Sequence, residues 1–485
     1  MRHSVIRHKA EVWVDPDVVF STLYGQSDRA FWLDSGVAAG AGFSYLGEGV
    51  RLVTAAARTG SLSFDPSVTV ESERAAEVAG DIFEFLAGEQ SGAVEPAEGA
   101  GGGFRLGWIG WFGYELRAKT MALPDADQVR RSRYPDAAWL EVVRAIEFDH
   151  ASGTMTLVAL ALTDTSTSDA WTGDNALWRD GVLAALDAGS LQTEPGRAGE
   201  NVAEATESIP EIHWAHSDDE YLSMIRECQD AITNGDAYQL CLTTQVAVDI
   251  RPDPLASYLA LRSLSPSHHG GFLRVGEYSL LSSSPETFLT VTTDGLIRSR
   301  PIKGTRRRGN TAQEDAALRT ELAASEKERA ENLMIVDLMR NDIARVSEVG
   351  SVSVPDLLAV ESYAQVHQLV STVQGQLRSD LRPMDAVVAC FPAGSMTGAP
   401  KSSAAAILDA LEGRPRGVYS GAFGYLGLDG RIELAMVIRS IVLDSEGATI
   451  GTGGGITALS VPEEELEEVK LKAAALLSVL GAGGS

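Results

Sequence analysis

Cysteine, long apolar runs and basic residues are the scarce features of this sequence. Its 485 residues include three cysteines, an odd number without metal-type spacing, so neither a disulfide framework nor a zinc site is expected. No stretch approaches the roughly 20 apolar residues of a membrane-spanning helix, and the N-terminus lacks the apolar core of a signal peptide, so we expect a cytoplasmic protein. Lysine and arginine number 40 against 67 acidic residues, and the formal charge of −27 disfavours nucleic-acid and membrane partners.

What is present is the composition of a globular protein with a sizeable core. Hydrophobic residues make up 44% and charged residues 22% of the chain. The character of the sequence changes along the chain, which predicts four regions of an α/β (α+β) fold. They are an N-terminal region (1–165), a polar linker or excursion (166–212), a sharply patterned region (213–478) and a flexible tail (479–485).

Two stretches predict helices that open with a capping box. In the first, Thr311 is followed three residues later by Glu314, and apolar periodicity runs on through residue 346, which predicts one long helix. In the second, Ser460 is followed by Glu463 at the start of an acidic helix. Both helices therefore have a defined N-terminus.

Each of these helices carries two glutamates three residues apart, so that both carboxylates lie on one face. The pairs are Glu328 with Glu331 and Glu465 with Glu468. Either pair alone is typical of a solvated helix face, but two converging pairs could enclose one hard divalent cation. Mg²⁺ fits best, because it takes few carboxylates, keeps water ligands and often bridges to an anionic substrate.

Residues 419–456 predict a meander of antiparallel strands with two turns, the first an Asp-Gly pair. Pairing across the turns places Arg439 opposite Ser420, beside Tyr419, and also opposite Thr452 in the glycine-rich run. An arginine fork, a phenol and glycine N–H groups together form a receptor for a carboxylate. The alternative is an arginine on a solvated sheet beside a flexible loop, although the apolar flanks favour a covered sheet.

Nine ordered blocks from about residue 215 to residue 478 resemble the signature blocks of the chorismate-utilising enzymes. They are SSSPETFL, RPIKGT, ERAENLMIVDLMRNDIARV, ESYAQVHQLVS, FPAGSMTGAPK, YSGAFGYL, ELAMVIRS, GTGGGI and EEELEEVKLKA. The resemblance implies a sandwich of two large, mostly antiparallel β-sheets packed together, with helices outside and the N- and C-terminal regions interleaved. PIKGT resembles the branch that forms aminodeoxychorismate for p-aminobenzoate and folate synthesis, whereas anthranilate synthases usually carry PIAGT.

The resemblance also implies catalytic roles. Lys303 matches a lysine thought to attack C2 of chorismate as the hydroxyl leaves C4, after which ammonia attacks C4. Glu286 matches the general acid that protonates the departing hydroxyl. Gln239 stands where salicylate and isochorismate synthases have a lysine that activates water, which argues against water as the nucleophile.

Binding roles follow from the same resemblance. Glu331 and Glu468 match Mg²⁺ ligands, and Glu328 and Glu465 match carboxylates that bind the ion directly or through water. The ring-pocket and carboxylate-binding positions are Thr305, His367, Tyr419, Arg439, Gly453 and Gly455.

Amination requires ammonia, and none of the three cysteines lies on the glycine-rich elbow of a glutaminase nucleophile. A separate glutamine amidotransferase subunit is therefore the expected partner, beside chorismate itself. Leu33, Asp34 and Ser35 resemble an element near the family's tryptophan pocket, which marks an effector site, but residues 265–273 depart from the usual partner segment.

Two alternatives stay open. An anthranilate synthase large subunit would share nearly every site residue but eliminate pyruvate, and Lys303 is the feature that discriminates against it. A non-catalytic regulator that binds chorismate or an amino acid is the other, and the presence of Glu286, Lys303 and four metal-type glutamates counts against it.

Overall fold

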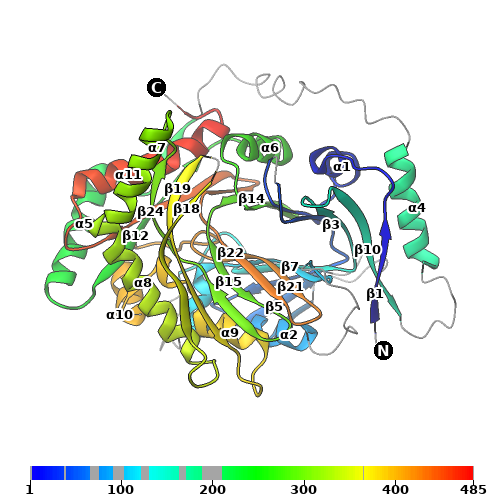
Figure 1. Ribbon diagram of the computed structural model, residues 1–485, viewed down its shortest axis with the longest axis horizontal. Helices are drawn as coiled ribbons and strands as arrows, with labels where there is room; N and C mark the ends of the chain where they lie inside the picture. The colour runs from blue at the N-terminus through cyan, green and yellow to red at the C-terminus, as the bar shows by residue number, and fades with distance from the viewer. Residues whose placement is uncertain are drawn as a thin grey trace.

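Two antiparallel β-sheets stack face to face at the centre of the molecule, with helices outside them (Figure 1). The computed structural model describes residues 3–37, 40–65, 76–90, 103–121, 130–162, 171–187, 210–363 and 365–483. In this part of the chain each sheet has twelve strands. Every strand pairing that is described there is antiparallel, as the resemblance implied.

The first sheet combines strands from both ends of the chain. In spatial order its strands are β1 (His3–Lys9), β10 (Thr154–Leu162), β9 (Arg144–Asp149), β3 (Phe43–Glu48), β2 (Ala30–Asp34), β13 (His269–Val275), β14 (Tyr278–Ser284), β23 (Ser440–Asp444), β24 (Gly447–Ile456), β12 (Gln239–Val248) and β11 (Ile212–Trp214), with β20 (Gly398–Ala399) beside β12.

The second sheet is mixed in the same way. Its strands are β17 (Ile302–Arg307), β19 (Val366–Gln376), β16 (Leu296–Ser299), β15 (Thr287–Val291), β22 (Ile432–Met436), β21 (Ala422–Gly427), β7 (Gly107–Phe112), β8 (Ala137–Val142), β4 (Arg51–Ala56), β5 (Ser61–Asp65) and β6 (Ala76–Ala79), with β18 (Ser353–Ser362) beside β19. The pairs β2–β13 and β7–β21 join the early and late strands, so the two halves of the chain interleave.

Alternation along the strands builds three apolar layers. Phe31 of the first sheet and Ile109 of the second belong to the layer between the two sheets, in the interior of the sandwich. Their neighbours point outward: Trp32 packs under helices on the first sheet, and Trp108 packs under helices on the second. Successive side chains of a strand point to opposite faces, so each sheet is covered on both sides.

The helices cover the two outer faces and the ends of the sandwich (Figure 1). No helix in the described ranges is both long and apolar enough to cross a membrane. The helices are α1 (Pro16–Leu23), α2 (Ile82–Gln90), α3 (Arg117–Thr120), α4 (Gly173–Asp187), α5 (Asp218–Thr233), α6 (Pro254–Leu264), α7 (Ala312–Ala324), α8 (Glu326–Ala344), α9 (Pro383–Cys390), α10 (Lys401–Glu412) and α11 (Pro462–Val479).

The long helix expected after Thr311 is two helices. Thr311 caps α7 as predicted, because its side chain accepts a hydrogen bond from the backbone N–H of Glu314. Ser325 then leaves helical geometry, with φ −60° and ψ 112°, and caps α8 through the N–H of Glu328. A serine side chain at this point competes with the helical backbone bond, which is the physical reason for the break.

The second predicted capping box is wrong. Val461 is the N-cap of α11, and no side chain caps that helix. The hydroxyl of Ser460 instead donates to a carboxylate oxygen of Glu465 at 2.7 Å. Ser460 therefore orients a glutamate of the predicted metal site rather than a helix end.

The predicted meander is divided between the sheets. Phe423 pairs with Ala435, within one residue of the expected register, and Ile441 pairs with Ile450 as expected. However, β22 belongs to the second sheet and β23 to the first, and the chain crosses between them at Arg439, whose φ is +50°. A positive φ is uncommon at a non-glycine residue, and here it marks the point at which the chain changes sheet.

Of the predicted linker at 166–212, the structure describes α4 and the chain from residue 210, and the remainder lies outside the described residues. Val182 of α4 packs into an apolar cluster with α1 and the first sheet. Within 479–485, Leu480 and Ala482 are buried in that cluster, and residues 484–485 lie outside the described ranges.

A buried ion pair ties the two sheets together. The guanidinium of Arg416 donates to both carboxylate oxygens of Glu412, at 2.6 and 2.8 Å, and to the carbonyl of Cys241 on β12 at 2.9 Å. It stacks over the ring of Tyr114, which follows β7 of the other sheet, at 4.3 Å. The backbone N–H of Arg416 donates to Glu115, so one residue connects α10, β12 and the end of β7.

Replacing this arginine should destabilise the whole protein. Arg416→Met leaves Glu412 buried without its cation, so we expect the free energy of unfolding in urea to fall by about 3–5 kcal/mol. The matched control is Arg382→Met, because Arg382 pairs with Glu84 at the surface and such pairs contribute at most about 1 kcal/mol. Equal losses for the two variants would contradict the central role of Arg416.

Candidate functional site

Lys303 crosses from one sheet to the other. It lies on β17 at a bulge, between the pairs Ile302–Val370 and Thr305–Gln368. Gly304 follows with φ +87°, and a Cβ there would lie 3.0 Å from the carboxyl of Glu328, so the bulge requires glycine. The ammonium nitrogen of Lys303 lies 3.7 Å from the position of a Cβ on Gly455 in β24 of the first sheet.

Glu286 is a buried carboxyl close to this lysine. It lies between β14 and β15, where the side chain of Ser395 and the N–H of Ile302 favour the ionised form of its carboxyl. Burial raises the pKa of Glu286 to about 7, although the nearby Lys303 cation opposes the shift. The carboxyl can therefore carry a proton near neutral pH, as a general acid must.

The glycine strand β24 forms the floor beneath Lys303. A Cβ on Gly455 would lie 2.5 Å from the amide nitrogen of Gln239. A larger residue at position 455 would therefore displace the side chain of Gln239 and crowd that of Lys303. The amide oxygen of Gln239 is buried and has no hydrogen-bond partner in the described part of the chain. It is a free acceptor beside the lysine, available to a ligand.

Tyr419 and Arg439 lie together at the next part of the floor. A Cβ on Gly451 would lie 2.0 Å from the ring of Tyr419, so the phenol rests directly on this glycine. Burial lowers the pKa of Arg439, and the opposing charges are Tyr419 and Glu468. No carboxylate in the described ranges lies within 4.0 Å of the Arg439 guanidinium, which leaves its donors for an anion.

Glu328 and Glu331 approach the lysine from α8. The more deeply buried is Glu331, and burial raises its pKa to about 7 against the opposing charges of Lys303 and Lys327. Glu328 accepts from Arg306 at 3.2 Å. Glu331 therefore lies within the electrostatic reach of Lys303, and Glu328 lies beside Gly304, the next residue of β17.

Glu465 and Glu468 approach from α11. A carboxylate oxygen of Glu465 lies 3.1 Å from the ammonium of Lys327, and Glu468 lies 2.7 Å from that of Lys472. Partial desolvation would raise the pKa of Glu468, but Lys472, Lys327 and Lys303 lower it overall. Lys472 was not among the residues predicted from the sequence, although its position four residues after Glu468 on one helix face could have indicated the pair.

The four glutamates bring hard oxygen donors from two helices to one place, which suits Mg²⁺ chemically. The ammonium groups of Lys327 and Lys472 lie among these carboxylates. Within the described residues, the one trio of ligand atoms all within 4.8 Å of one another is elsewhere, at the exposed Glu211, His213 and Asp249. Glu331 feels the charges of Glu328 and Glu465, and Lys327 feels those of Glu331, Glu465 and Glu468, so the two pairs share one electrostatic neighbourhood. That they hold one ion together stays a prediction.

His367 and Thr305, which were predicted to line the ring pocket, make no direct contact with the catalytic pair Lys303 and Glu286 through a hydrogen bond in the described structure. His367 is buried, but both ring nitrogens are engaged, one with Ser362 at 2.8 Å and the other with Asp315 at 3.0 Å. Thr305 follows the bulge on β17 and is exposed. No hydrogen bond joins either residue to Lys303 or Glu286 in the described structure.

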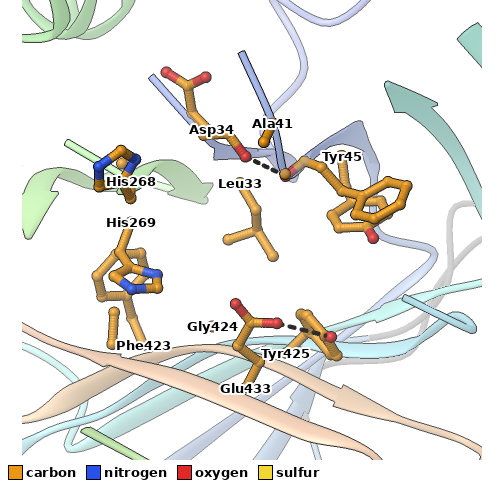
Figure 2. Close-up of a pocket in the computed structure, with 15 residues that line it drawn as sticks. Leu33, Asp34, Ala41, Tyr45, His268, His269, Phe423, Gly424, Tyr425 and Glu433 are labelled. Carbon is orange, nitrogen blue, oxygen red and sulfur yellow. Dashed lines mark hydrogen bonds between the residues drawn. The ribbon is translucent and has the colours of Figure 1, made fainter. Parts of the chain in front are cut away.

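The predicted effector residues lie apart from Lys303, in the wall of a cavity of about 290 Å³ (Figure 2). Leu33, Asp34 and Ser35 all line it, together with His268 and His269 of the divergent segment 265–273. The carboxylate of Asp34, however, points away from the cavity centre in Figure 2 and accepts from Arg262 at 2.5 Å and from Tyr258 at 3.2 Å. Asp34 is therefore already neutralised, and an effector role for this cavity stays a prediction.

The chain is similar to known proteins over nearly its whole length. The sequence model of a family described as chorismate binding enzyme matches residues 44–478. Aminodeoxychorismate synthases of Streptomyces pristinaespiralis and Streptomyces griseus are 40% and 42% identical over 96% of the chain. The chain spans 64% and 63% of their lengths. The crystal structure of anthranilate synthase component I from Streptococcus pneumoniae superposes with a TM-score of 0.72 at 26% identity, covering 97% of this chain and 99% of that one.

Proposed function

The chain belongs to the chorismate-binding enzyme family, and on that premise we propose that it is the large subunit of an aminodeoxychorismate synthase. It would convert chorismate and ammonia to 4-amino-4-deoxychorismate. The observation that carries the proposal is the lysine of PIKGT, whose amine lies over the glycine strand and close to the buried carboxyl of Glu286. An amine nucleophile and a protonated carboxyl are the two groups that replacement of a hydroxyl requires.

Chorismate is a dianion, and the site offers two kinds of group to hold it. The Arg439 guanidinium and the backbone N–H groups of the glycine strand can bind a carboxylate. Glu331 and Glu468, with Glu328 and Glu465 beside them, would hold Mg²⁺. When bound, this ion neutralises carboxylate charge and fixes the substrate's orientation. The unpartnered amide oxygen of Gln239 can accept from a hydroxyl or amine of the substrate.

Substitution at C4 proceeds in two balanced steps. The ammonium of Lys303 first loses a proton to solvent. Glu286 then gives its proton to the C4 hydroxyl, which leaves as water, while the freed amine of Lys303 forms a bond to C2 and the ring double bond shifts. Ammonia then bonds to C4, the double bond shifts back, and the C2–nitrogen bond to Lys303 breaks. The proton lost by ammonia returns to Glu286, and the lysine regains its proton from solvent, which restores the site.

The ammonia would come from a separate glutamine amidotransferase subunit. All three cysteines are buried, and burial raises the pKa of each thiol, which disfavours the thiolate that a glutaminase nucleophile needs. We place the enzyme in the cytoplasm, on a route to p-aminobenzoate.

Anthranilate synthase is the second candidate. The whole-length similarity to anthranilate synthase component I from Streptococcus pneumoniae supports it. That enzyme's reaction places nitrogen at C2 of chorismate, the atom that Lys303 would itself occupy in our proposal. A lysine at this place therefore favours amination at C4.

Removal of the lysine amine tests the nucleophile. We expect Lys303→Ala to lower the rate of 4-amino-4-deoxychorismate formation by about a hundredfold, the scale typical of one catalytic group, while chorismate still binds. Traces of 2-amino product or anthranilate should appear, because ammonia gains access to C2. Lys303→Arg should fail equally, because a guanidinium stays protonated. Products are separated by chromatography after reaction with chorismate, Mg²⁺ and ammonium.

The matched control is Lys470→Ala, an exposed lysine of α11 that pairs with Asp218. This variant should keep wild-type rate and product. If Lys303→Ala also matched wild type in both, Lys303 would be the end of a basic hairpin and nothing more.

The pKa of Glu286 predicts an alkaline limit to activity. A general acid must be protonated, and the pKa of Glu286 is raised to about 7. At saturating Mg²⁺ and fixed free ammonia, kcat/KM should fall as pH rises through about 7, approaching tenfold per pH unit. Glu286→Gln should be slow and lose this limb. Glu115→Gln serves as the control, because burial also raises the pKa of Glu115 to about 7, outside the site. An unchanged limb in Glu286→Gln would contradict the assignment.

A further inference from the structure

The metal-type glutamates are held by cations that belong to the chain itself. Three of the four pair with a basic side chain, whereas Glu331 has no ion pair within 4.0 Å among the described residues. The pairs are Glu328 with Arg306 at 3.2 Å, Glu465 with Lys327 at 3.1 Å, and Glu468 with Lys472 at 2.7 Å.

Lys327 differs from the other two cations in what else holds it. Arg306 is fixed by two further hydrogen bonds to Glu321, and Lys472 donates to the carbonyl of Gly453 at 2.9 Å. Lys327 donates to Glu465 alone within the described structure. Its side chain is 41% exposed, although the carboxylate that it contacts is 4% exposed. The ammonium therefore enters the site from solvent on a flexible stem.

Lys327 also lies where its positive charge would repel a bound metal ion strongly. It belongs to α8 and contacts Glu465 of α11, so it bridges the two helices that supply the metal-type carboxylates. Glu331 and Glu468 both act on its charge. One ammonium thus interacts with three of the four glutamates.

We propose that Lys327 is a tethered counter-ion that holds these carboxylates together in the metal-free protein and withdraws into solvent when the divalent cation binds, so that it sets the cation affinity. The inference rests on the proposed Mg²⁺ site. Glu465 keeps its orientation after the withdrawal, because the same oxygen that contacts Lys327 also accepts from Ser460 at 2.7 Å. Like charges at such distances repel, so a cation that shares the site with the ammonium binds more weakly than one that does not.

The experiment measures cation binding alone, without chorismate or ammonia. Mn²⁺ is titrated into the metal-free full chain, and the free ion is followed by electron paramagnetic resonance. We expect Lys327→Met, which keeps the apolar stem and loses the charge, to bind Mn²⁺ about tenfold more tightly than wild type, which corresponds to about 1.4 kcal/mol. Lys327→Arg keeps the charge and should bind no more tightly than wild type, and the exposed Lys470→Met should match wild type.

A second readout is the thermal midpoint of unfolding in chelator and in saturating Mg²⁺. Lys327→Met should unfold below wild type in chelator and regain that difference with Mg²⁺, and a variant that folds only with Mg²⁺ would support the same account. Equal or weaker Mn²⁺ binding by Lys327→Met, or no binding by wild type, would overturn the inference. Neither result bears on which nitrogen product forms from chorismate, so the amination proposal is tested separately.

Discussion

The reach of one lysine across the sandwich constrains the rest of the site. Lys303 starts on β17 of the second sheet, and its amine ends against β24 of the first. Two sheets packed face to face are separated by about 10 Å of side chains, so the amine can arrive only where the facing strand has none. The glycines of β24 meet this requirement: Gly455 leaves room for Lys303 and Gln239, and Gly451 leaves room for Tyr419.

Charge is the second constraint. Taken together, burial and like charges disfavour several carboxylates in one place, and Glu331 responds with a pKa raised to about 7. Lys303 of β17 and Lys327 of α8 oppose that shift, and Lys472 of α11 lowers the pKa of Glu468. The site is therefore a balanced cluster before any ligand arrives. A divalent ion and a dianionic substrate can enter it together with little change in net charge.

The parts of the fold that depend on neighbours in sequence could be predicted. Thr311 caps α7, and the turns set both hairpin registers to within one residue. The change of sheet at Arg439 could not be predicted, because alternation along a strand does not say which sheet the strand joins.

The site residues show the same division between features set by nearby sequence and features set by contacts between distant segments. The two glutamate pairs were visible in the spacing, and the roles of Lys303 and Glu286 came from the family resemblance. The partners that tune these groups were not visible, because contacts such as Lys327 with Glu465 join helices far apart in the sequence. Ser460 illustrates the limit: its spacing predicts a helix cap, but the burial of Glu465 makes it a partner for that carboxylate.

The central claim is that this site replaces the C4 hydroxyl of chorismate by an amino group. It is tested most directly by incubation of the purified chain with chorismate, Mg²⁺ and ¹⁵N-ammonium, with the position of the nitrogen determined by nuclear magnetic resonance. The account predicts ¹⁵N on C4 of a product that keeps its enolpyruvyl group. Nitrogen on C2, with release of pyruvate and an aromatic product, would contradict it.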